Sequence, residues 1–374
     1  MSQATPTDSP TPHPAALPAA IPPDAAPVAA VRWDGGAPVI IDQRRLPDEL
    51  VEWRLETVAA VVEAIQTLAV RGAPAIGVAG AYGMVVGLDE GGAAGLDAAA
   101  VQALIARLAV TVGEARPTAV NLSAAVRRVV SATAGAPDGA AARAAALADA
   151  IAQHEEDAAA SAAMGRHGRI ALAGARRILT HCNTGRLAAA GDGTALGVIY
   201  AMGAAGEIDE VLVCEARPLL QGGRLTAWEL GRSGLPHRLI VDGAAGAAMA
   251  AGMVDAVIVG CDRVAANGDT ANKIGTYNLA VLAARHGIPF WVAGPRSTFD
   301  PRTASGADIV IEERSPAEVR GFRDVVWAPA GVRAWNPAFD VTPAELITGF
   351  VTDAGILRAP FGPAIAAALA EGAA

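Results

Sequence analysis

The sequence has few cysteines and no long apolar or basic run, and each of these absences excludes a class of protein. Its three cysteines, Cys182, Cys214 and Cys261, form no C-x-x-C pair and no Cys/His zinc spacing, so neither a disulfide framework nor a zinc module is expected. Free thiols are typical of a reducing compartment, and we expect a cytoplasmic protein. The most apolar stretch, residues 243–254, is too short to cross a bilayer, which predicts that the chain spans no membrane.

Basic residues are too scattered to predict nucleic-acid binding. The formal net charge is -9, and an acidic surface repels phosphate backbones and anionic lipids. The sequence has no G-x-G-x-x-G fingerprint and no Walker A loop, which disfavours nicotinamide dehydrogenases and P-loop enzymes. A small anionic substrate is compatible with this charge, because a few convergent basic side chains bind it whatever the net charge.

The 374 residues divide by composition into three parts. Residues 1–28 contain eight prolines among Ala, Ser, Thr and Asp, which predicts a disordered tail without a part in the chemistry. Residues 29–145 have apolar positions at helical spacing, which predicts a mainly helical N-terminal domain. Helices are expected near residues 55–68, 76–86, 96–112, 124–132 and 140–164, the last of them connecting two domains.

Residues 146–374 alternate short β-rich runs with helical stretches. The expected strands are residues 177–180, 211–214, 239–241, 257–259, 290–292 and 309–311. Alternation of this kind is typical of βαβ units, so we expect an α/β protein with a Rossmann-like, doubly wound parallel sheet in its C-terminal domain. The mainly helical N-terminal domain is expected to be the smaller one.

Polar side chains follow several of these strands, at the edge where ligands bind in open parallel sheets. Cys182 follows the first strand and Asp262 follows the fourth, which makes both candidates for the chemistry. Each also has a structural interpretation, because a cysteine at a strand end is often a small buried apolar residue and an aspartate often caps a turn. Gln221, Asn272 and Lys273 lie in loops beyond the same edge.

Two breaks in the helical half are candidates for binding an anion. Arg71-Gly72-Ala73 precedes a helix, and a guanidinium beside helix N-terminal amides is a good phosphate clamp. Arg116 ends another helix and has the same interpretation. Both breaks are equally compatible with a helix end and a surface arginine. A Gly-rich turn at residues 191–194 is a third candidate, since it opens a helix.

Several long motifs, in order along the chain, resemble those of the S-methyl-5-thioribose-1-phosphate isomerase family. They are RGAPAIG at 71–77, RPTAVNL at 116–122, HCNTG at 181–185, RPLLQG at 217–222, the run from 262 to 276, and NPAFDVTP at 336–343. The similarity extends over residues 33–362. That family shares a superfamily with regulatory subunits of the initiation-factor-2 exchange factor.

This resemblance implies a homodimeric aldose–ketose isomerase of methionine salvage that acts on a small phosphorylated sugar. It implies that Asp262 is the proton donor and that Cys182 stabilises the transition state. The substrate-binding positions that it implies are Arg71, Gly72, Ala73, Arg116, Gln221, Asn272 and Lys273. No cofactor and no metal is expected for the reaction. Departures from the family pattern at Ser123, Ala216 and Cys261 concern substrate preference and leave the reaction type unchanged.

The reaction that the resemblance implies explains the need for these residue types. A phosphate on C1 blocks opening to a free aldehyde, so the ring must open at its oxygen while hydrogen moves from C2 to C1. An aspartate protonates the departing oxygen near neutral pH only if burial raises its pKa. We therefore expect Asp262 in an apolar pocket, with Arg71, Arg116 and Lys273 around the phosphate. The sequence distinguishes neither an enolate-like route from hydride transfer nor which of Cys182 and Asp262 is the base.

Two alternatives within the same superfamily stay open. A sister isomerase would act on 5-deoxyribose 1-phosphate or ribose 1,5-bisphosphate, and the wall around the 5-position of the sugar would separate these substrates. A non-catalytic regulatory subunit would keep the fold but would need neither Cys182 nor Asp262.

Overall fold

The N-terminal half is a helical bundle beside a small antiparallel sheet. The computed structural model describes residues 28–116 and 120–371, so residues 1–27 of the expected tail lie outside the described residues. The elements of this half are β1 (Val31–Asp34), β2 (Ala37–Ile41), β3 (Glu52–Arg54), α1 (Val58–Gln66), α2 (Ala73–Glu90), α3 (Ala98–Gly113) and α4 (Val120–Thr133). The helices expected in this half are present, and a three-stranded sheet with the order β1-β2-β3 accompanies them.

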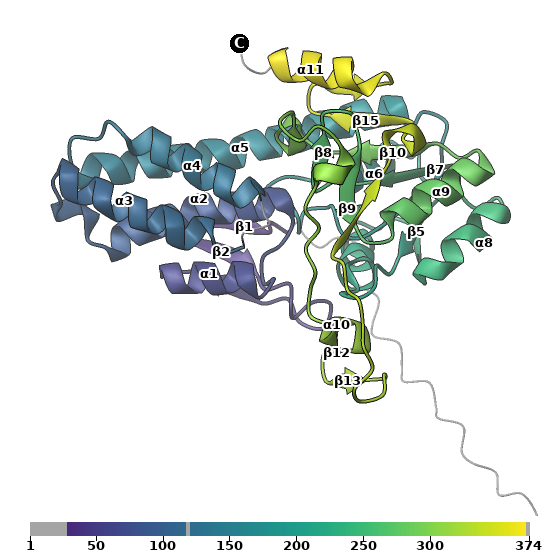
Figure 1. Ribbon diagram of the computed structural model, residues 1–374, viewed down its shortest axis with the longest axis horizontal. Helices are drawn as coiled ribbons and strands as arrows, with labels where there is room; N and C mark the ends of the chain where they lie inside the picture. Colours follow the sequence, from purple (N-terminus) through teal and green to yellow (C-terminus); the bar gives the residue numbers. More distant parts are fainter. Residues whose placement is uncertain (1–27, 117–119, 372–374) are drawn as a thin grey trace, which may run out of the picture.

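Helix α2 lies at the centre of this bundle (Figure 1). It begins after Gly72 and has Pro74 in its first turn, where an N–H would have no partner within the helix. Residues 75–88 are buried all round, as expected for a helix that other elements surround. Glycines allow close packing here, since a Cβ on Gly80 would lie 2.3 Å from the Leu122 side chain of α4.

Helix α5 (Gly139–Ala171) connects the two halves. Asp138 caps it by accepting a hydrogen bond from the Ala141 amide at 2.8 Å. Its 33 residues extend over about 50 Å at 1.5 Å per residue. The helix packs against α2 and α4 in one half and against α6 (Ala195–Ala204) and β15 (Gly349–Thr352) in the other. The expected domain boundary at residue 145 lies inside this continuous helix.

The C-terminal half is built on a seven-stranded sheet with the order β16-β15-β10-β7-β4-β5-β6. All pairs are parallel except the one made by β16 at the edge. The strands not yet named are β4 (Arg177–Thr180), β5 (Glu210–Cys214), β6 (His237–Ile240), β7 (Ala256–Val259), β10 (Phe290–Ala293) and β16 (Gly355–Leu357).

Helices cover both faces of this sheet. Alternate strand residues enter two separate cores: Ile178 and Ile258 pack with residues of α6, and Leu179 and Val257 pack with residues of α8 (Ala245–Ala250) and α9 (Thr276–His286). Helix α11 (Phe361–Glu371) also contributes to the second core. The expected α/β class with a doubly wound parallel sheet is confirmed.

A second, smaller sheet continues from the carboxyl end of β7. It has the order β11-β8-β9-β14 and consists of β8 (Arg263–Ala265), β9 (Thr270–Lys273), β11 (Phe299–Asp300) and β14 (Phe339–Thr342). These strands were not among those predicted from the sequence. They hold Lys273 opposite Phe339 in the β9–β14 register.

The strand expected at residues 309–311 is wrong. These residues follow a short 3₁₀ turn and pair with no strand of the described chain, and Val310 is 83% exposed. Three β-branched residues favour a strand by propensity, but a strand needs a neighbour to pair with. This stretch runs instead toward a hairpin of β12 (Gly321–Phe322) and β13 (Val325–Val326) that projects from the molecule (Figure 1).

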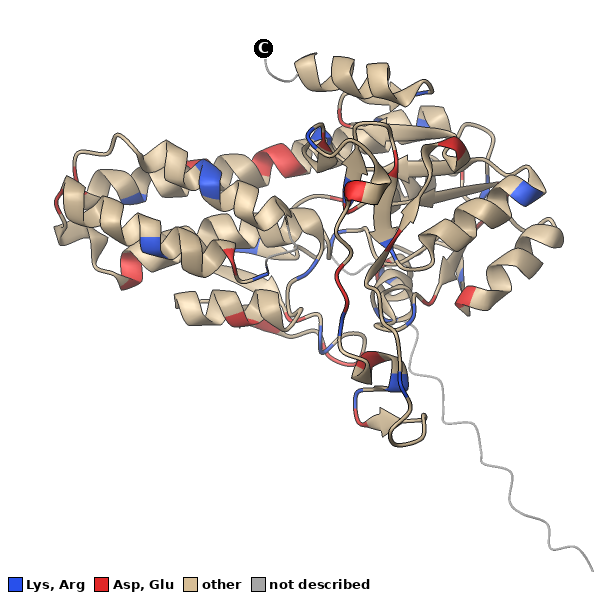
Figure 2. Ribbon diagram, viewed as in Figure 1, with Lys and Arg blue, Asp and Glu red and all other residues tan. Residues whose placement is uncertain are grey.

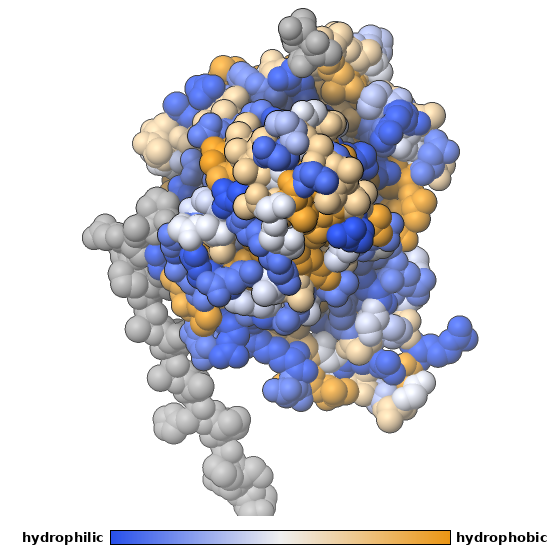
Figure 3. All heavy atoms as spheres, turned by 90° about the vertical axis from the view of Figure 1, so that its left-hand side faces the viewer, coloured by the Kyte–Doolittle hydropathy of each residue, from blue (hydrophilic) through white to orange (hydrophobic). Residues whose placement is uncertain are grey.

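Charged and apolar residues are distributed over the whole length of the described chain. Basic and acidic residues are interspersed over both halves (Figure 2). On the helical end, apolar side chains alternate with hydrophilic ones (Figure 3). Within residues 28–116 and 120–371, no helix is long and apolar enough to cross a membrane.

Candidate active site

A cavity lies where the start of α2 meets the carboxyl edge of the large sheet. It encloses about 780 Å³ of empty space, the solvent at its mouth included. The residues predicted from the sequence all line it, and they come from both halves: Arg71, Gly72, Ala73, Arg116, Cys182, Gln221, Asp262, Asn272 and Lys273. Residues 200 positions apart in the sequence therefore meet around one space.

Cys182 is held in a strained backbone conformation at the end of β4. Its φ is 64°, in the left-handed region that costs a non-glycine residue about 1–3 kcal/mol. The Thr226 hydroxyl donates to the Cys182 carbonyl at 2.6 Å. Thr226 ends a π-helical turn, residues 222–226, that directly follows Gln221. Backbone strain and π-turns both concentrate at functional sites. The local geometry therefore favours a functional role for the Cys182 thiol.

A buried carboxylate fixes the residue after Cys182. The side-chain amide of Asn183 donates to Glu229 Oε1 at 2.7 Å, and the Tyr200 hydroxyl donates to Glu229 Oε2 at 2.9 Å. The backbone amide of Arg186 also donates to Glu229 Oε2, at 2.8 Å. Burial raises the pKa of Glu229, and these donors oppose that shift by stabilising the ionised form. Glu229 thus fixes the loop that follows Cys182 through these hydrogen bonds.

Arg71 binds the same loop from the helical half. Its guanidinium donates to the Asn183 carbonyl at 2.9 and 3.0 Å and to the Asn183 side chain, while Nε donates to Gln43 at 3.1 Å. In this conformation Arg71 therefore holds Asn183 in place and presents a positive charge at the cavity wall.

The start of α2 approaches the loop that follows Asn183. Gly72 has a φ of 93°, and a Cβ there would lie 2.6 Å from the Ala188 carbonyl oxygen. Only glycine fits both the conformation and the contact. Because Gly72, Ala73 and Pro74 line the cavity, the positive end of the α2 dipole faces it.

Asp262 lies in the short connection after β7, and β8 begins at the next residue. Its backbone amide donates to Ala271 of β9 at 2.9 Å, which fixes the side chain at the cavity. Burial raises the pKa of Asp262, and the nearby charges of Lys273, Arg116 and Arg71 oppose that shift. Asp262 is partly buried, and the direction of its pKa shift agrees with the expectation for a proton donor that holds its proton to a higher pH.

Lys273 is the only lysine in the chain. It is buried, its Nζ donates to the Ala338 carbonyl at 2.9 Å, and it lies 4.7 Å above the Phe339 ring. Burial lowers the pKa of Lys273, while Cys182 and Asp262 favour its charged form. The ammonium therefore lies close enough to both candidate catalytic groups to influence each.

Two buried polar atoms of the cavity residues are unpaired. Arg116 Nε and Gln221 Oε1 have no hydrogen-bond partner among the described residues. A buried polar atom without a partner carries a free-energy cost of about 1–3 kcal/mol. A ligand with an anionic acceptor near Arg116 and a hydroxyl donor near Gln221 would remove that cost. A sugar phosphate carries both groups.

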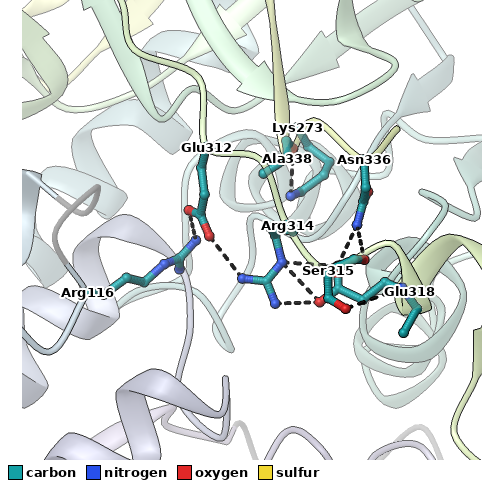
Figure 4. Close-up of polar contacts among 9 residues, drawn as sticks. Arg116, Lys273, Glu312, Arg314, Ser315, Glu318, Asn336 and Ala338 are labelled. Carbon is teal, nitrogen blue, oxygen red and sulfur yellow. Dashed lines mark hydrogen bonds and ion pairs between the residues drawn. The ribbon is translucent and has the colours of Figure 1, made fainter. Parts of the chain in front are cut away.

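Two charged residues that were not predicted, Arg314 in the cavity lining and Glu312 beside it, contact the predicted site. Glu312 accepts from Arg116 at 3.1 Å and from Arg314 at 3.0 Å, so it lies between the two guanidinium groups (Figure 4). Arg314 lines the cavity and also pairs with Glu318 at 2.6 Å. Asn336 supports that pair by donating to Glu318 at 3.0 Å. No sequence signal marks these residues, because they lie in an irregular segment almost 200 positions from Arg116.

Comparison with known proteins agrees with the motifs. The sequence profile of the Initiation factor 2 subunit family matches residues 69–359. The chain belongs to this family. A methylthioribose-1-phosphate isomerase of Desulforudis audaxviator is 53% identical over 350 residues, which cover 92% of this chain and 99% of that protein. The resemblance inferred from the sequence is thereby confirmed.

Two further relatives indicate how close this similarity is. A 5-deoxyribose 1-phosphate isomerase of Moorella thermoacetica is 49% identical, over 92% of this chain and 98% of that protein. The crystal structure of a 5-methylthioribose 1-phosphate isomerase from Pyrococcus horikoshii has a TM-score of 0.85 and 39% identity, over 92% of this chain and 96% of that one.

Proposed function

We propose that the chain is an aldose–ketose isomerase that converts S-methyl-5-thio-α-D-ribose 1-phosphate into S-methyl-5-thio-D-ribulose 1-phosphate, a step of methionine salvage. The observation that carries this proposal is the presence of Cys182, Asp262 and three cationic side chains around one cavity. Relatives named methylthioribose-1-phosphate isomerase, 46–53% identical over at least 91% of the chain, support it.

Asp262 is the proton donor in this proposal. Substrate and product are isomers, so hydrogen leaves C2 and arrives at C1 while the bond between C1 and the ring oxygen breaks. The ring oxygen takes a proton as it departs, and the C2 hydroxyl loses its proton as C2 becomes a ketone, so no net proton is gained or lost. The raised pKa of Asp262 keeps that proton available, and general acid catalysis contributes typically about 10²- to 10⁴-fold.

Cys182 acts at the carbon atoms in the same proposal. Its strained loop, supported by Asn183 and Glu229, places the thiol at the cavity and keeps it there. The Cys182 side chain then shelters the hydrogen that moves from C2 to C1, or receives it as a proton. Turnover in heavy water separates these routes, because a proton route brings solvent deuterium to C1 and direct transfer does not.

The phosphate is held by positive charge from both halves. Arg71, Arg116 and Lys273 line the cavity, and the N-terminal end of α2 adds its dipole. Holding the phosphate on C1 in a fixed place orients C1 and C2 for the reaction. This lowers the entropy cost of the reaction. Arg314 adds a further cation at the same wall.

The cavity favours a substrate with an apolar group at its 5-position. Leu68, Ala188, Ala189 and Leu219 contribute apolar lining, which suits a methylthio or methyl group better than a second phosphate. The Moorella relative acts, by its name, on 5-deoxyribose 1-phosphate. We therefore propose this sugar as a second substrate.

A turnover assay tests the proposal. Purified full-length protein is incubated with methylthioribose 1-phosphate, 5-deoxyribose 1-phosphate or ribose 1,5-bisphosphate, and the C2 ketone is followed by ¹³C NMR. We expect conversion of the first two and at least tenfold lower kcat/KM for the bisphosphate. Absence of turnover with all three would overturn the proposal and favour a regulatory subunit.

We further propose that the enzyme is a cytoplasmic homodimer. The projecting segment around the β12–β13 hairpin exposes Val326 (71%), Trp327 (53%) and Trp335 (77%), an apolar set suited to burial against a second copy. Light scattering coupled to size-exclusion chromatography tests this state. A monomer at micromolar concentration would refute it.

A further inference from the structure

Three potential metal ligands meet at the ends of neighbouring strands, beside the cavity. His181 follows β4, Cys214 ends β5 and Asp242 lies just beyond β6, and these strands are adjacent in the sheet. One ring nitrogen, one sulfur and one carboxylate oxygen lie within 4.8 Å of one another. None of the three is among the described residues that line the cavity. The cluster is therefore a separate site.

The His181 ring has the orientation of a metal ligand. Its Nε2 lies 2.8 Å from the Ile274 carbonyl oxygen, and since a carbonyl only accepts, Nε2 carries the proton. Nδ1 then has a free lone pair. This buried atom has no hydrogen-bond partner among the described residues and lies 3.8 Å from Asp242 Oδ1. Two electron-rich atoms that face each other in the interior are unfavourable unless a proton or a metal ion lies between them.

The Asp242 carboxylate is also fixed as ligating carboxylates are. It accepts hydrogen bonds from the backbone amides of Ala216 at 2.9 Å and Arg217 at 2.8 Å. A carboxylate has about four acceptor positions, so further positions remain for a metal. Metal-bound histidines commonly donate their second N–H to a backbone carbonyl, and metal-bound carboxylates are themselves hydrogen-bonded. Both supporting interactions are present here.

We propose that His181, Cys214 and Asp242 bind one Zn²⁺ ion. A nitrogen, a thiolate and a carboxylate are typical zinc ligands, and a water completes the tetrahedron. Ligand atoms of a tetrahedral zinc site lie roughly 3.4–3.6 Å apart. His181 Nδ1 and Asp242 Oδ1 are 3.8 Å apart and all three ligand atoms lie within 4.8 Å of one another, so the side chains must move closer together to bind the ion. Zn²⁺ replaces the thiol proton of Cys214, which passes to solvent.

The ion has a structural role at the edge of the active site. His181 precedes Cys182, and the His181 ring holds Ile274, which follows Lys273. Asp242 holds the backbone of Arg217, in the loop that leads to Gln221. The ion therefore ties together three loops that carry cavity residues. It takes no part in the isomerisation, so its presence is independent of the proposed function.

Metal content tests the proposal directly. Full-length protein is stripped with chelator, dialysed against Zn²⁺ and measured by mass spectrometry of the metal, and Co²⁺ replaces Zn²⁺ for absorption spectroscopy. We expect one Zn²⁺ per chain and a thiolate-to-cobalt charge-transfer band. C214S and H181Q should each lower the stoichiometry at least tenfold, while C261S and H167Q keep one Zn²⁺ per chain.

Each outcome decides the proposal. C214S changes a single atom, and circular dichroism establishes that the variant is folded. Absence of stoichiometric Zn²⁺ in the wild type, or retention of it in folded C214S, would overturn the site. Loss of Zn²⁺ in C182S but not in C214S would place the metal at the catalytic thiol and would also overturn it.

Discussion

Replacing Asp262 by Asn separates catalysis from stability. The D262N variant keeps the shape of the side chain and removes its acidic proton. The carboxyl lies near Lys273, Arg116 and Arg71, and burial raises its pKa. The account therefore predicts that the variant loses the general acid but no packing.

The size of both effects follows from this environment. Loss of a general acid lowers the rate about 10²- to 10⁴-fold, which corresponds to about 2.7–5.4 kcal/mol at 1.36 kcal/mol per tenfold. Stability changes in the opposite sense. The folded state holds the Asp262 proton more tightly than the unfolded chain, whose Asp titrates near 3.9. Wild-type stability therefore falls as pH rises from that value through the raised pKa, and D262N lacks this loss.

Two measurements on the same preparations check this reasoning. Values of kcat/KM on methylthioribose 1-phosphate between pH 5 and 9 should fall at high pH in the wild type as Asp262 loses its proton. Thermal unfolding at pH 5 and 8 should show D262N at least as stable as the wild type at pH 8. A folded D262N with more than a tenth of wild-type kcat/KM would refute the role of Asp262.

Three further variants test the surroundings of the cavity. G72A places a Cβ 2.6 Å from the Ala188 carbonyl oxygen at a φ of 93°. We expect a loss of about 1–3 kcal/mol in the free energy of unfolding, measured with urea. An unchanged unfolding midpoint would contradict the close contact. E312Q weakens the contact that orients Arg116, so KM should rise about tenfold with little change in kcat. The matched control is E318Q, because Glu318 contacts Arg314 but not Arg116 in the pairs described. Equal effects of the two substitutions would argue against this role of Glu312. E229Q replaces an acceptor of several hydrogen bonds by a group that also donates, so kcat should fall at least tenfold and unfolding should become easier by about 1–3 kcal/mol; unchanged kcat in a folded variant would remove Glu229 from the support of Cys182.

The large sheet was predictable because local pattern and tertiary structure agree there. Buried parallel strands such as Ala256–Val259 consist of short apolar runs, and the helices between them have clear breaks. The small sheet was not predictable. Thr270–Lys273 is buried but polar in sequence, and its strand pairs with the short β8 on one side and with Phe339–Thr342, from far along the chain, on the other. The apolar run at 309–311 shows the converse, since propensity without a partner forms no strand.

The candidate site was predictable to the extent that its residues follow strand ends or open a helix. Cys182 and Asp262 both follow buried strands, and Arg71 directly precedes α2. The supporting residues have no such signal. Glu229 lies in a helix as an ordinary charged residue, and Glu312 lies in an irregular segment. Their roles depend on side-chain contacts across the fold, which spacing in the sequence does not reveal.

A double-mutant cycle tests most directly whether the thiol and the carboxyl act on one bound sugar. Values of kcat/KM on methylthioribose 1-phosphate are measured for wild type, C182A, D262N and the double variant, each shown to be folded. Residues that act as a unit have non-additive effects. We predict that each single variant loses at least 100-fold and that the double variant is no more than tenfold worse than the slower single one. Losses that multiply in full, or a single variant that keeps wild-type activity, would contradict a shared role in this cavity.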